Sequence, residues 1–308
     1  MKTIVTMTMN PAIDKSSSVA HVAAERKLYC KPPRFEPGGG GVNVSRAIKK
    51  LGGESLLLYP AGGLTGERLK ALLNREGLNH RPFPIEGLIR ESLVILEEST
   101  GQQYRFGMPG PEVQEKEWKQ FLDGLSAVEP TPAYLVAGGS LPPGVPADFY
   151  ARAARVGKKR GAKVIIDASG EALDQALQEG VYLVKPNIRE FRELVGEDIK
   201  EESQIKAEAQ KMVKSGRCEV LVISLGAAGA LMVSQEFTEH ILPPTVPIVS
   251  KVGAGDSMVA GIVLSLARGK PLRESVLFGV AAGTAAVMTP GTELCRREDV
   301  ERLYAQMV

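Results

Sequence analysis

The sequence contains few cysteines, few histidines and no long apolar run. Only three of its 308 residues are cysteine (Cys30, Cys218 and Cys295), and they are scattered along the chain. An odd number of unclustered cysteines argues against a disulfide framework and against a zinc site, and it fits a reducing compartment. No segment reaches the roughly 18 consecutive apolar residues of a membrane helix. These absences predict a cytoplasmic protein without a membrane partner.

The charge balance excludes a further class of partner. The 38 Lys and Arg residues nearly balance the 36 Asp and Glu residues, which leaves a net charge of +2. So small a charge creates no broad field for nucleic acid or for an anionic membrane, and we expect a small-molecule ligand instead. The three histidines, His21, His80 and His240, stand alone in the sequence. The expected general base is therefore a carboxylate.

From about Ala133 onward, short β-rich runs alternate with longer helical segments, which is typical of βαβ units and a parallel sheet. We predict strands at 134–137, 163–167, 183–185 and 220–224, and a helix at 147–159. In open parallel sheets, ligands bind outside the carboxyl ends of the strands. Those ends carry small and polar residues, namely Gly138-Gly139-Ser140, Asp167, Lys185-Pro186-Asn187 and Ser224-Leu225-Gly226. Four strands should therefore deliver functional groups to one edge of the sheet.

The first hundred residues follow a different pattern. Residues 3–9 predict a strand, whereas residues 16–35 form a β-like stretch with charges and prolines and too little apolar content for a core strand. A second β-rich pair, 92–97 and 103–106, is joined by a hairpin connection that ends in Gly101. We expect these pieces to form a small accessory sheet that acts as a lid over the edge of the main sheet.

The run Gly253-Ala254-Gly255-Asp256 stands directly before an apolar helical segment at 258–267. Small residues at a helix N-terminus let successive backbone N–H groups point at an anion, such as a phosphoryl group in transfer. Asp256 in the first turn could then accept the proton of an attacking hydroxyl. Taken alone, the pattern favours an Asp N-cap after a glycine turn, and the other motifs reverse that preference.

Four glycines, Gly38 to Gly41, precede a second helical segment that runs to about Leu51. Glycine permits unusual backbone angles and close approach to a ligand, and Asn43 offers both a donor and an acceptor to vicinal hydroxyls. This combination suits a sugar. The alternative is a flexible loop, although linkers rarely carry four glycines at the start of an amphipathic helix.

Two further motifs suit a nucleotide. Asn187 and Glu190 are three residues apart at a helix start, so they could hold Mg²⁺ through waters, but a simple capping box would look the same. The glycines of the segment 224–230 could let the chain approach a nucleotide, or they could form a hairpin turn. The sequence has no Gly-x-x-x-x-Gly-Lys-Ser/Thr run, which excludes a Walker-type P-loop, and no Gly-x-Gly-x-x-Gly after the first strand.

Together these motifs resemble the ribokinase-like sugar kinase family, in order and spacing, over essentially the whole chain. Within the family the chain is most similar to the bacterial 6-phosphofructokinases of the ribokinase-like type, through the runs 35–44, 103–106, 108–110 and 139–145. The resemblance implies a three-layer α/β/α fold with a mostly parallel central sheet and a small β-sheet lid. It implies one kinase domain over residues 1–308, with lid segments at about 15–36 and 88–107.

The resemblance also implies an activity, namely ATP-dependent and Mg²⁺-dependent phosphorylation of fructose 6-phosphate at its 1-hydroxyl. The partner would be a phosphorylated ketohexose, and the chain would form a homodimer through the lid sheets. Two members of the same family, 1-phosphofructokinase and tagatose-6-phosphate kinase, share nearly all these motifs and remain alternatives. A non-catalytic sugar-phosphate sensor and a nicotinamide-dependent dehydrogenase are the alternatives from other classes. Retention of Asp256, Asn187 and Glu190 disfavours the first, and the missing dinucleotide motif disfavours the second.

By resemblance, residue roles can be assigned position by position. Asp256 would be the base and Gly253, Ala254 and Gly255 the anion hole. Asp14, Gly39 and Asn43 would bind sugar hydroxyls, and Lys27, Arg90, Arg105 and Ser140 would line the phosphosugar end. Lys185, Asn187, Ser224, Gly226 and Gly229 would line the nucleotide, with Ala282 and Ala286 near adenine and Glu190 beside Mg²⁺. Solvated surface charge is the alternative for Lys27 and the two arginines, and helix packing is the alternative for the two alanines.

The family often has a monovalent-cation loop beside the anion hole, built from backbone carbonyls. Ser250, Val252 and Gly291 would correspond to it and could hold K⁺. The sequence departs from the family in two places, because Lys251 stands where threonine is common and Glu293 where the nearest relatives have arginine. Lys251 could partly replace the charge of the cation, or it could point to solvent.

Overall fold

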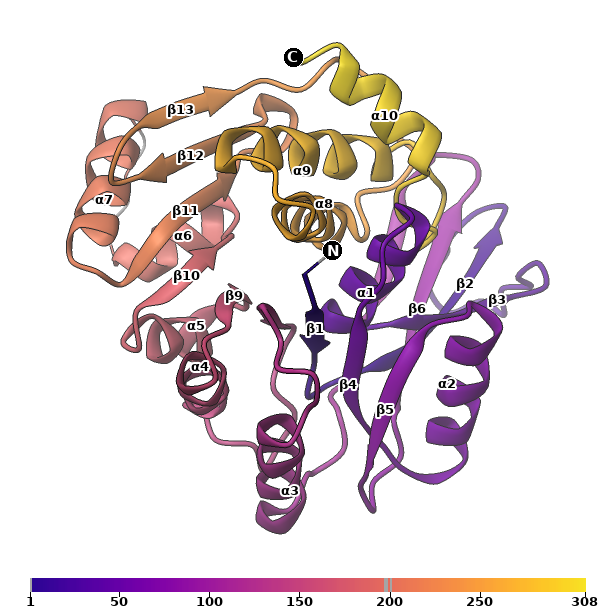
Figure 1. The fold of residues 1–308 in the computed structure, drawn as a ribbon. Coiled ribbons are helices and arrows are strands. Elements are labelled where there is room, and N and C mark those ends of the chain that lie inside the picture. Colours follow the sequence, from indigo (N-terminus) through magenta and orange to yellow (C-terminus); the bar gives the residue numbers. More distant parts are fainter. Residues whose placement is uncertain (1, 197–198, 200) are drawn as a thin grey trace.

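The computed structural model describes residues 2–196, 199 and 201–308. Its centre is a nine-stranded sheet in the order β13-β12-β11-β10-β9-β8-β1-β4-β5 (Figure 1). The seven strands from β11 to β5 pair in parallel, and only β12 and β13 are antiparallel. Their bounds are β1 Ile4–Met7, β4 Leu56–Ala61, β5 Asn79–Pro84, β8 Tyr134–Gly138, β9 Lys163–Asp167, β10 Val181–Val184, β11 Cys218–Ser224, β12 Ala230–Ser234 and β13 Thr238–Ile241. The predicted mostly parallel sheet is confirmed.

Helices cover both faces of this sheet because successive side chains of each buried strand point to opposite faces. On one face, Ile4 and Val136 pack against helices α1 (Gly40–Lys50), α8 (Ala254–Ala267), α9 (Leu272–Ala286) and α10 (Arg297–Ala305). On the other face, Val5 and Leu135 join a core covered by α2 (Gly63–Arg75), α3 (Glu115–Ser126), α4 (Phe149–Lys159), α5 (Gly170–Leu177), α6 (Ile188–Val195) and α7 (Glu202–Lys214). The three-layer α/β/α fold is therefore confirmed (Figure 1).

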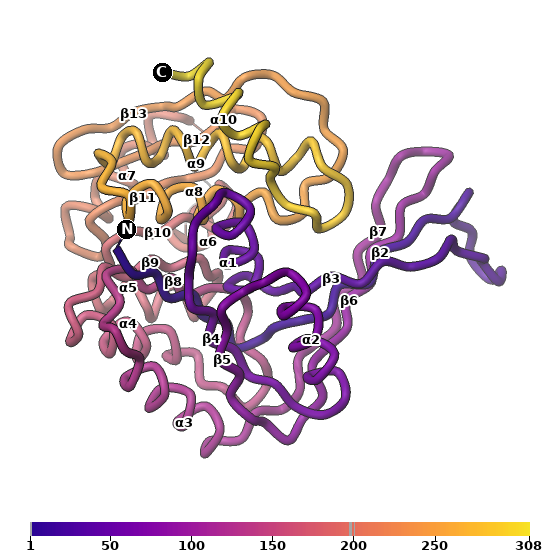
Figure 2. Tube along the Cα trace, turned by 45° about the vertical axis from the view of Figure 1, so that its right-hand side comes forward, coloured from indigo at the N-terminus to yellow at the C-terminus, as the bar shows by residue number. Residues whose placement is uncertain are grey.

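A second sheet of four strands, in the order β3-β2-β6-β7, projects from the main body (Figure 2). Its strands are β2 Ala12–Val19, β3 Arg34–Gly38, β6 Arg90–Glu97 and β7 Gln103–Phe106. The β6–β7 hairpin is where the sequence predicts it. The β-like stretch predicted at 16–35 is wrong in its middle, because residues 20–33 form no strand and are mostly exposed. Prolines and charged side chains in that link leave it without the apolar face that pairing would bury.

The remaining differences lie at element ends. The first strand ends at Met7 rather than Met9, the helix predicted from Ala147 begins at Phe149, and the helix predicted from Met258 begins at Ala254. With the helix starting at Ala254, Asp256 lies in the first helical turn, as the sequence predicts. No helix in the described part of the chain is long and apolar enough to cross a membrane.

Candidate active site

Asp256 lies in the first turn of α8, at the edge of the sheet where the parallel strands end. The helix begins after Gly253, whose φ of 73° is left-handed, and a Cβ there would lie 2.3 Å from a methyl carbon of Leu294. Only glycine fits this position without strain. The first-turn N–H groups of α8 have no partner from a preceding helical turn, so the turn formed by 253–255 is suited to an anion.

The surroundings of Asp256 disfavour its ionised form. Burial raises the pKa of its carboxyl group from 3.8 to about 7, and the nearby carboxylate of Asp167 acts in the same direction. A hydrogen bond from Asn43 Nδ2 to Asp256 Oδ2 (2.9 Å) and the ammonium group of Lys185 act in the opposite direction. A carboxylate with a pKa near neutrality is suited to accept a proton as a general base.

Lys185 supplies the positive charge beside this turn. Its side chain is buried at the end of β10, where Nζ pairs with Asp167 Oδ1 at 3.2 Å. Burial lowers the pKa of Lys185, but the carboxylates of Asp167, Glu190 and Asp256 outweigh it, so the pKa is raised and the ammonium stays charged. A Cβ on Gly255 would lie 3.2 Å from Nζ, so the ammonium group borders the candidate anion hole directly. Asp167 is thus part of the site. The sequence predicts its position at this edge of the sheet but no role for it.

The glycine run is a close-packed turn and not a flexible linker. Gly39 has a φ of 102° and precedes α1, while a Cβ on Gly41 would lie 2.3 Å from the carbonyl oxygen of Met7. A Cβ on Gly40 would lie 2.8 Å from the backbone nitrogen of Gly139. Helix α1 can therefore start directly against the ends of β1 and β8, which brings Asn43 to Asp256.

Asp14 faces the same turn from strand β2 of the small sheet. Its carboxyl group lies against Gly38, where a Cβ would be 2.3 Å from Oδ2. Burial raises the pKa of Asp14 to about 6, although the guanidinium groups of Arg46 and Arg90 lower it. The predicted sugar-hydroxyl residues Asp14, Gly39 and Asn43 therefore lie together where the small sheet joins the main body.

A cavity of about 560 Å³ lies next to these residues. Arg90 and Ser140, both predicted for the phosphosugar end, line it together with Asn10. Arg105 is exposed on β7, and Lys27 is exposed in the 20–33 link, where its Nζ lies 5.2 Å from the ring centroid of Tyr29. Two of the four predicted phosphosugar residues thus line this cavity, and the other two lie outside it.

Asn187 and Glu190 form a capping box, which is one of the two alternatives that their spacing in the sequence allows. Asn187 Oδ1 accepts from the backbone N–H groups of Arg189 and Glu190, and Glu190 Oε2 accepts from the backbone N–H of Asn187. The cap fixes both side chains at the start of α6, beside Lys185. Within the described residues Glu190 Oε1 has no hydrogen-bond partner, so it suits a metal-bound water.

The glycine-containing segment after β11 is a hairpin connection, and it begins beside Asn187. Leu225 N–H donates to the carbonyl of Gly229 at 2.7 Å, and Ser224 is bridged to Asn187 in parallel register. Gly229 has a φ of 85°, and a Cβ there would lie 2.0 Å from the carbonyl oxygen of Ile241. Gly226 also has a positive φ, 64°, but it faces open space.

Ala282 and Ala286 are both fully buried in α9. A Cβ on Gly261 of α8 would lie 3.0 Å from the Cβ of Ala282. Their positions therefore favour helix packing over an adenine contact.

The candidate cation loop is held together by Ser250. Its hydroxyl donates to the carbonyl of Gly291 at 3.0 Å and accepts from the backbone N–H of Val252 at 3.2 Å. Lys251 points to solvent, and Glu293 pairs with Arg296 at 2.7 Å. Of the two alternatives for Lys251, the structure favours the exposed one.

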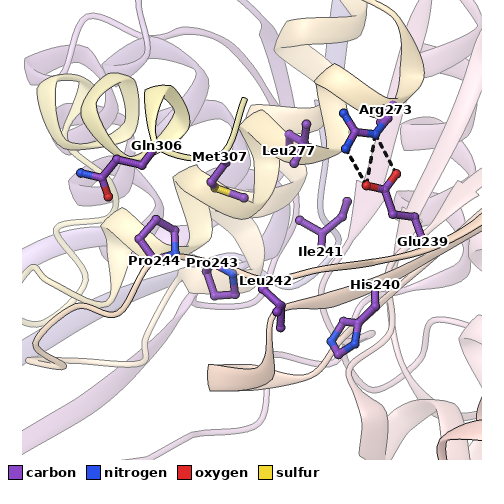
Figure 3. Close-up of a pocket in the computed structure, with 10 residues that line it drawn as sticks. All are labelled: Glu239, His240, Ile241, Leu242, Pro243, Pro244, Arg273, Leu277, Gln306 and Met307. Atoms are coloured by element: carbon purple, nitrogen blue, oxygen red, sulfur yellow. Dashed lines mark hydrogen bonds and ion pairs between the residues drawn. The ribbon is translucent and has the colours of Figure 1, made fainter.

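Another cavity, of about 430 Å³, lies between β13, α9 and the end of α10 (Figure 3). An ion pair between Glu239 and Arg273 forms one wall, and Pro243, Leu277 and Met307 contribute apolar surface. None of the predicted site residues lines this cavity. The candidate active site is thus confined to the edge where α8, β10 and the small sheet meet.

The chain is similar to known proteins over nearly its whole length. The model of the pfkB family of carbohydrate kinases matches residues 4–299. ATP-dependent 6-phosphofructokinase isozyme 2 from Mycobacterium tuberculosis is 45% identical over 98% of this chain and 88% of its own length. The Escherichia coli protein of that name is 42% identical over 100% and 99%. A 1-phosphofructokinase from Bacillus subtilis is less similar, at 31% identity over 99% and 98%.

Solved structures of the E. coli phosphofructokinase-2 match the fold over 100% of this chain and 99% of theirs. The complex with fructose-6-phosphate has a TM-score of 0.95 at 41% identity. The complex with potassium has a TM-score of 0.96 at 42% identity.

Proposed function

The chain belongs to the pfkB family of carbohydrate kinases, and from that premise we propose that it transfers the γ-phosphoryl group of ATP to the 1-hydroxyl of fructose 6-phosphate. It is a sugar kinase whose acceptor is an alcohol. The observation that carries the proposal is that the buried Asp256 carboxyl group and the Lys185 ammonium group both lie beside the glycine turn at the start of α8. A candidate general base and a buried cation are therefore both adjacent to the candidate anion hole.

In this mechanism Asp256 accepts the proton of the attacking 1-hydroxyl while Asn43 holds the carboxylate in place. The backbone N–H groups of the 253–255 turn and the ammonium of Lys185 stabilise the charge on the transferring phosphoryl group. When bound with the nucleotide, Mg²⁺ neutralises phosphate charge, and Asn187 and Glu190 would hold its waters. Ser224, Gly226 and Gly229 would line the nucleotide.

The cationic end of the site favours a phosphorylated sugar over an unphosphorylated one. Arg90 and Ser140 line a cavity adjoining Asp14, so a substrate that already carries a phosphate can be bound at one end while its free hydroxyl reaches Asp256. Among the phosphorylated acceptors, fructose 6-phosphate is supported by the greater similarity of this chain to 6-phosphofructokinases than to 1-phosphofructokinases. Tagatose 6-phosphate and fructose 1-phosphate remain the substrates to compare.

The finer features of the enzyme follow the same proposal. Residues 1–308 would act as one kinase domain in the cytoplasm, with the small sheet as a lid that excludes water during transfer. K⁺ would bind at Ser250, Val252 and Gly291. Two chains would associate through their small sheets and bring the exposed Lys27 and Arg105 into the interface.

The proposal is tested by ADP formation from Mg-ATP with four acceptors, namely fructose 6-phosphate, fructose 1-phosphate, tagatose 6-phosphate and fructose. We expect the highest kcat/KM with fructose 6-phosphate. A higher value with fructose 1-phosphate or tagatose 6-phosphate would move the enzyme to the corresponding related activity. No acceptor-dependent ADP release with any of the four would refute the kinase mechanism itself.

A further inference from the structure

Asn10 lies at the crossing between the two sheets. It follows β1 of the main sheet and precedes β2 of the small sheet, with Pro11 directly after it. The residue is 4% exposed and forms part of the wall of the 560 Å³ cavity. This buried amide takes no part in the phosphoryl transfer itself, so its position calls for another explanation.

Asn10 contacts one residue from each side of the cavity. Its backbone carbonyl accepts a hydrogen bond from Arg90 Nη2 at 3.1 Å, and Arg90 begins strand β6 of the small sheet. Its side-chain Nδ2 donates to Ser140 Oγ at 3.0 Å, and Ser140 follows β8 of the main sheet. A single residue therefore contacts both of the predicted phosphosugar residues that line the cavity.

The direction of the second hydrogen bond has a chemical consequence. A serine hydroxyl has one proton to donate, and because Asn10 Nδ2 is a donor, Ser140 Oγ acts as the acceptor. The Ser140 proton thus remains available to an oxygen of the phosphate, which as a dianion offers only acceptors. Arg90 Nε is also buried and has no partner among the described residues, so a second donor at the cavity is unused.

The amide of Asn10 has little freedom to change this arrangement. A Cβ on Gly110 would lie 2.3 Å from Asn10 Oδ1, so the 108–110 segment packs directly on the amide. Asn10 Oδ1 is itself buried without a partner in the described part of the chain. The close packing keeps the side chain against Ser140, with Gly110 on its other side.

We propose that Asn10 is a positioning residue for the phosphate of the substrate, which it serves by orienting the Ser140 hydroxyl as a donor and by holding the Arg90 guanidinium. This inference rests on the proposed phosphosugar kinase function. Asn10 does not touch the transferring group. It links the small sheet to the main body at the end of the site that discriminates a phosphorylated from an unphosphorylated sugar.

The sharpest test is Asn10→Asp, which has nearly the same shape but replaces the donor by an acceptor and adds a negative charge. We expect the dissociation constant for fructose 6-phosphate to rise by about tenfold or more, since a donor is lost and a like charge faces the phosphate. The kcat value and the KM for ATP should stay within about threefold, because Asp256 and Lys185 are untouched. Asn79→Asp, which adds the same charge on an exposed residue at the opposite end of the sheet, is the matched control.

A mutant cycle separates positioning from general loosening of the fold. Asn10→Ala and Ser140→Ala should each weaken fructose 6-phosphate binding by about three- to tenfold, and the double variant should be only slightly weaker than either single variant. Fully additive losses would overturn the proposal, as would equal losses for fructose and fructose 6-phosphate. If the Asn10 variants fail to fold, Ser140→Ala still tests the proposal, because unchanged phosphosugar affinity in that variant would overturn the role given to Asn10 in orienting the Ser140 hydroxyl.

The outcome can be told apart from failure of the proposed function. Binding of fructose 6-phosphate and of inorganic phosphate is measured by calorimetry and does not depend on turnover. An enzyme that binds both ligands through Asn10 but releases no ADP would refute the kinase proposal and keep this one. An active kinase whose Asn10→Asp variant binds fructose 6-phosphate as tightly as the wild type would keep the kinase proposal and refute the positioning role of Asn10.

Discussion

At the scale of single residues, the protonation state of the Asp256 carboxyl group determines the pH range in which the enzyme is active. Burial holds the pKa of Asp256 at about 7, so a large fraction of the free enzyme carries a protonated base in mildly acidic solution. A protonated carboxyl group cannot accept the proton of the sugar hydroxyl. Activity should therefore depend on pH close to neutrality, well above the ordinary range of an aspartate.

The first prediction concerns Asp256 and its pKa. The value of kcat/KM should rise with pH through an apparent pKa of about 7, and Asp256→Asn should lower kcat by about 10²–10⁴-fold. The KM values should change little, because the lost group acts on the attacking hydroxyl and not on the phosphate end. Steady-state kinetics from mildly acidic to mildly alkaline pH measure both effects. Near-normal turnover in the variant would assign the base to another residue.

The same substitution should stabilise the fold at alkaline pH. The pKa of Asp256 is raised in the folded state from 3.8 to about 7, so the folded state binds this proton more tightly than the unfolded state. Stability from that proton is fully present below pH 3.8 and is lost as the pH rises through about 7. The neutral amide of the Asp256→Asn variant does not titrate, so at alkaline pH the variant should gain about 1–3 kcal/mol in urea unfolding. A gain of the same size in acid, where Asp256 is already protonated, would contradict this explanation.

The sequence indicates Asp256, Asn43 and the glycine turns because their motifs are local. It does not indicate the role of Asp167 or Asn10, since each acts through a neighbour that is distant in the chain. The Asp167 carboxylate raises the pKa of Asp256 across the sheet edge, and Asn10 holds Arg90 and Ser140 from two different sheets. Such roles depend on which strands lie next to one another, and residue patterns alone do not show this.

At the scale of elements, the loop that follows α9 is tied to the base of the small sheet. Arg46 of α1 is 2% exposed, binds Glu76 through Nε at 2.8 Å, and donates to the carbonyls of Pro37 and Thr292. Thr292 in turn donates to Glu36 at 2.6 Å. Buried hydrogen bonds therefore connect this part of the candidate cation loop to strand β3. We expect the conformation of the loop to depend on that of β3.

The third prediction concerns K⁺ and this loop. Because Lys251 is exposed, we expect that it does not replace a cation and that K⁺ raises kcat/KM relative to tetramethylammonium at equal ionic strength. Lys251→Thr should change the ratio of kcat/KM in the two salts by no more than about twofold, which is about 0.5 kcal/mol of activation free energy. Activity assays in the two salts measure the response. A wild-type enzyme indifferent to K⁺, together with a Lys251→Thr variant that requires it, would show instead that Lys251 carries the charge.

Element types follow from the sequence more reliably than element ends. The strands that end at Asp167 and Ser224 are apolar and bounded by turns, so their periodicity is clear. The 20–33 link has strand-forming residues but no apolar face, and the structure leaves it outside the sheet. Its conformation depends on what it packs against, which the residues of the link do not specify.

At the scale of the whole molecule, the small sheet presents apolar side chains that this chain alone leaves exposed. Tyr29 is 79% exposed, Phe106 49% and Met108 47%, and all three lie on the projecting sheet or its links. Figure 2 shows that these segments extend away from the main body. A second copy of the chain, packed sheet against sheet, would cover this surface and bring Lys27 and Arg105 near the phosphosugar end of a site.

The last prediction follows from that arrangement. Combining Tyr29→Asp and Phe106→Asp should place two charges in the interface and raise the dimer dissociation constant by about 30-fold or more, which corresponds to the cost of losing interface anchors. Size-exclusion chromatography with light scattering measures the mass of the assembly. Leu64→Asp is the matched control, because Leu64 is 85% exposed on α2, outside the small sheet.

The kinetic consequence distinguishes this interface from any other contact between copies. If Lys27 and Arg105 act only in the dimer, the monomeric variant should show a raised KM for fructose 6-phosphate, and adding charge at Leu64 should not. A variant that stays dimeric would place the interface elsewhere on the molecule. A monomer with unchanged KM would mean that Arg90 and Ser140, set in place by Asn10, suffice for the phosphate, and that the small sheet serves each chain as its own lid.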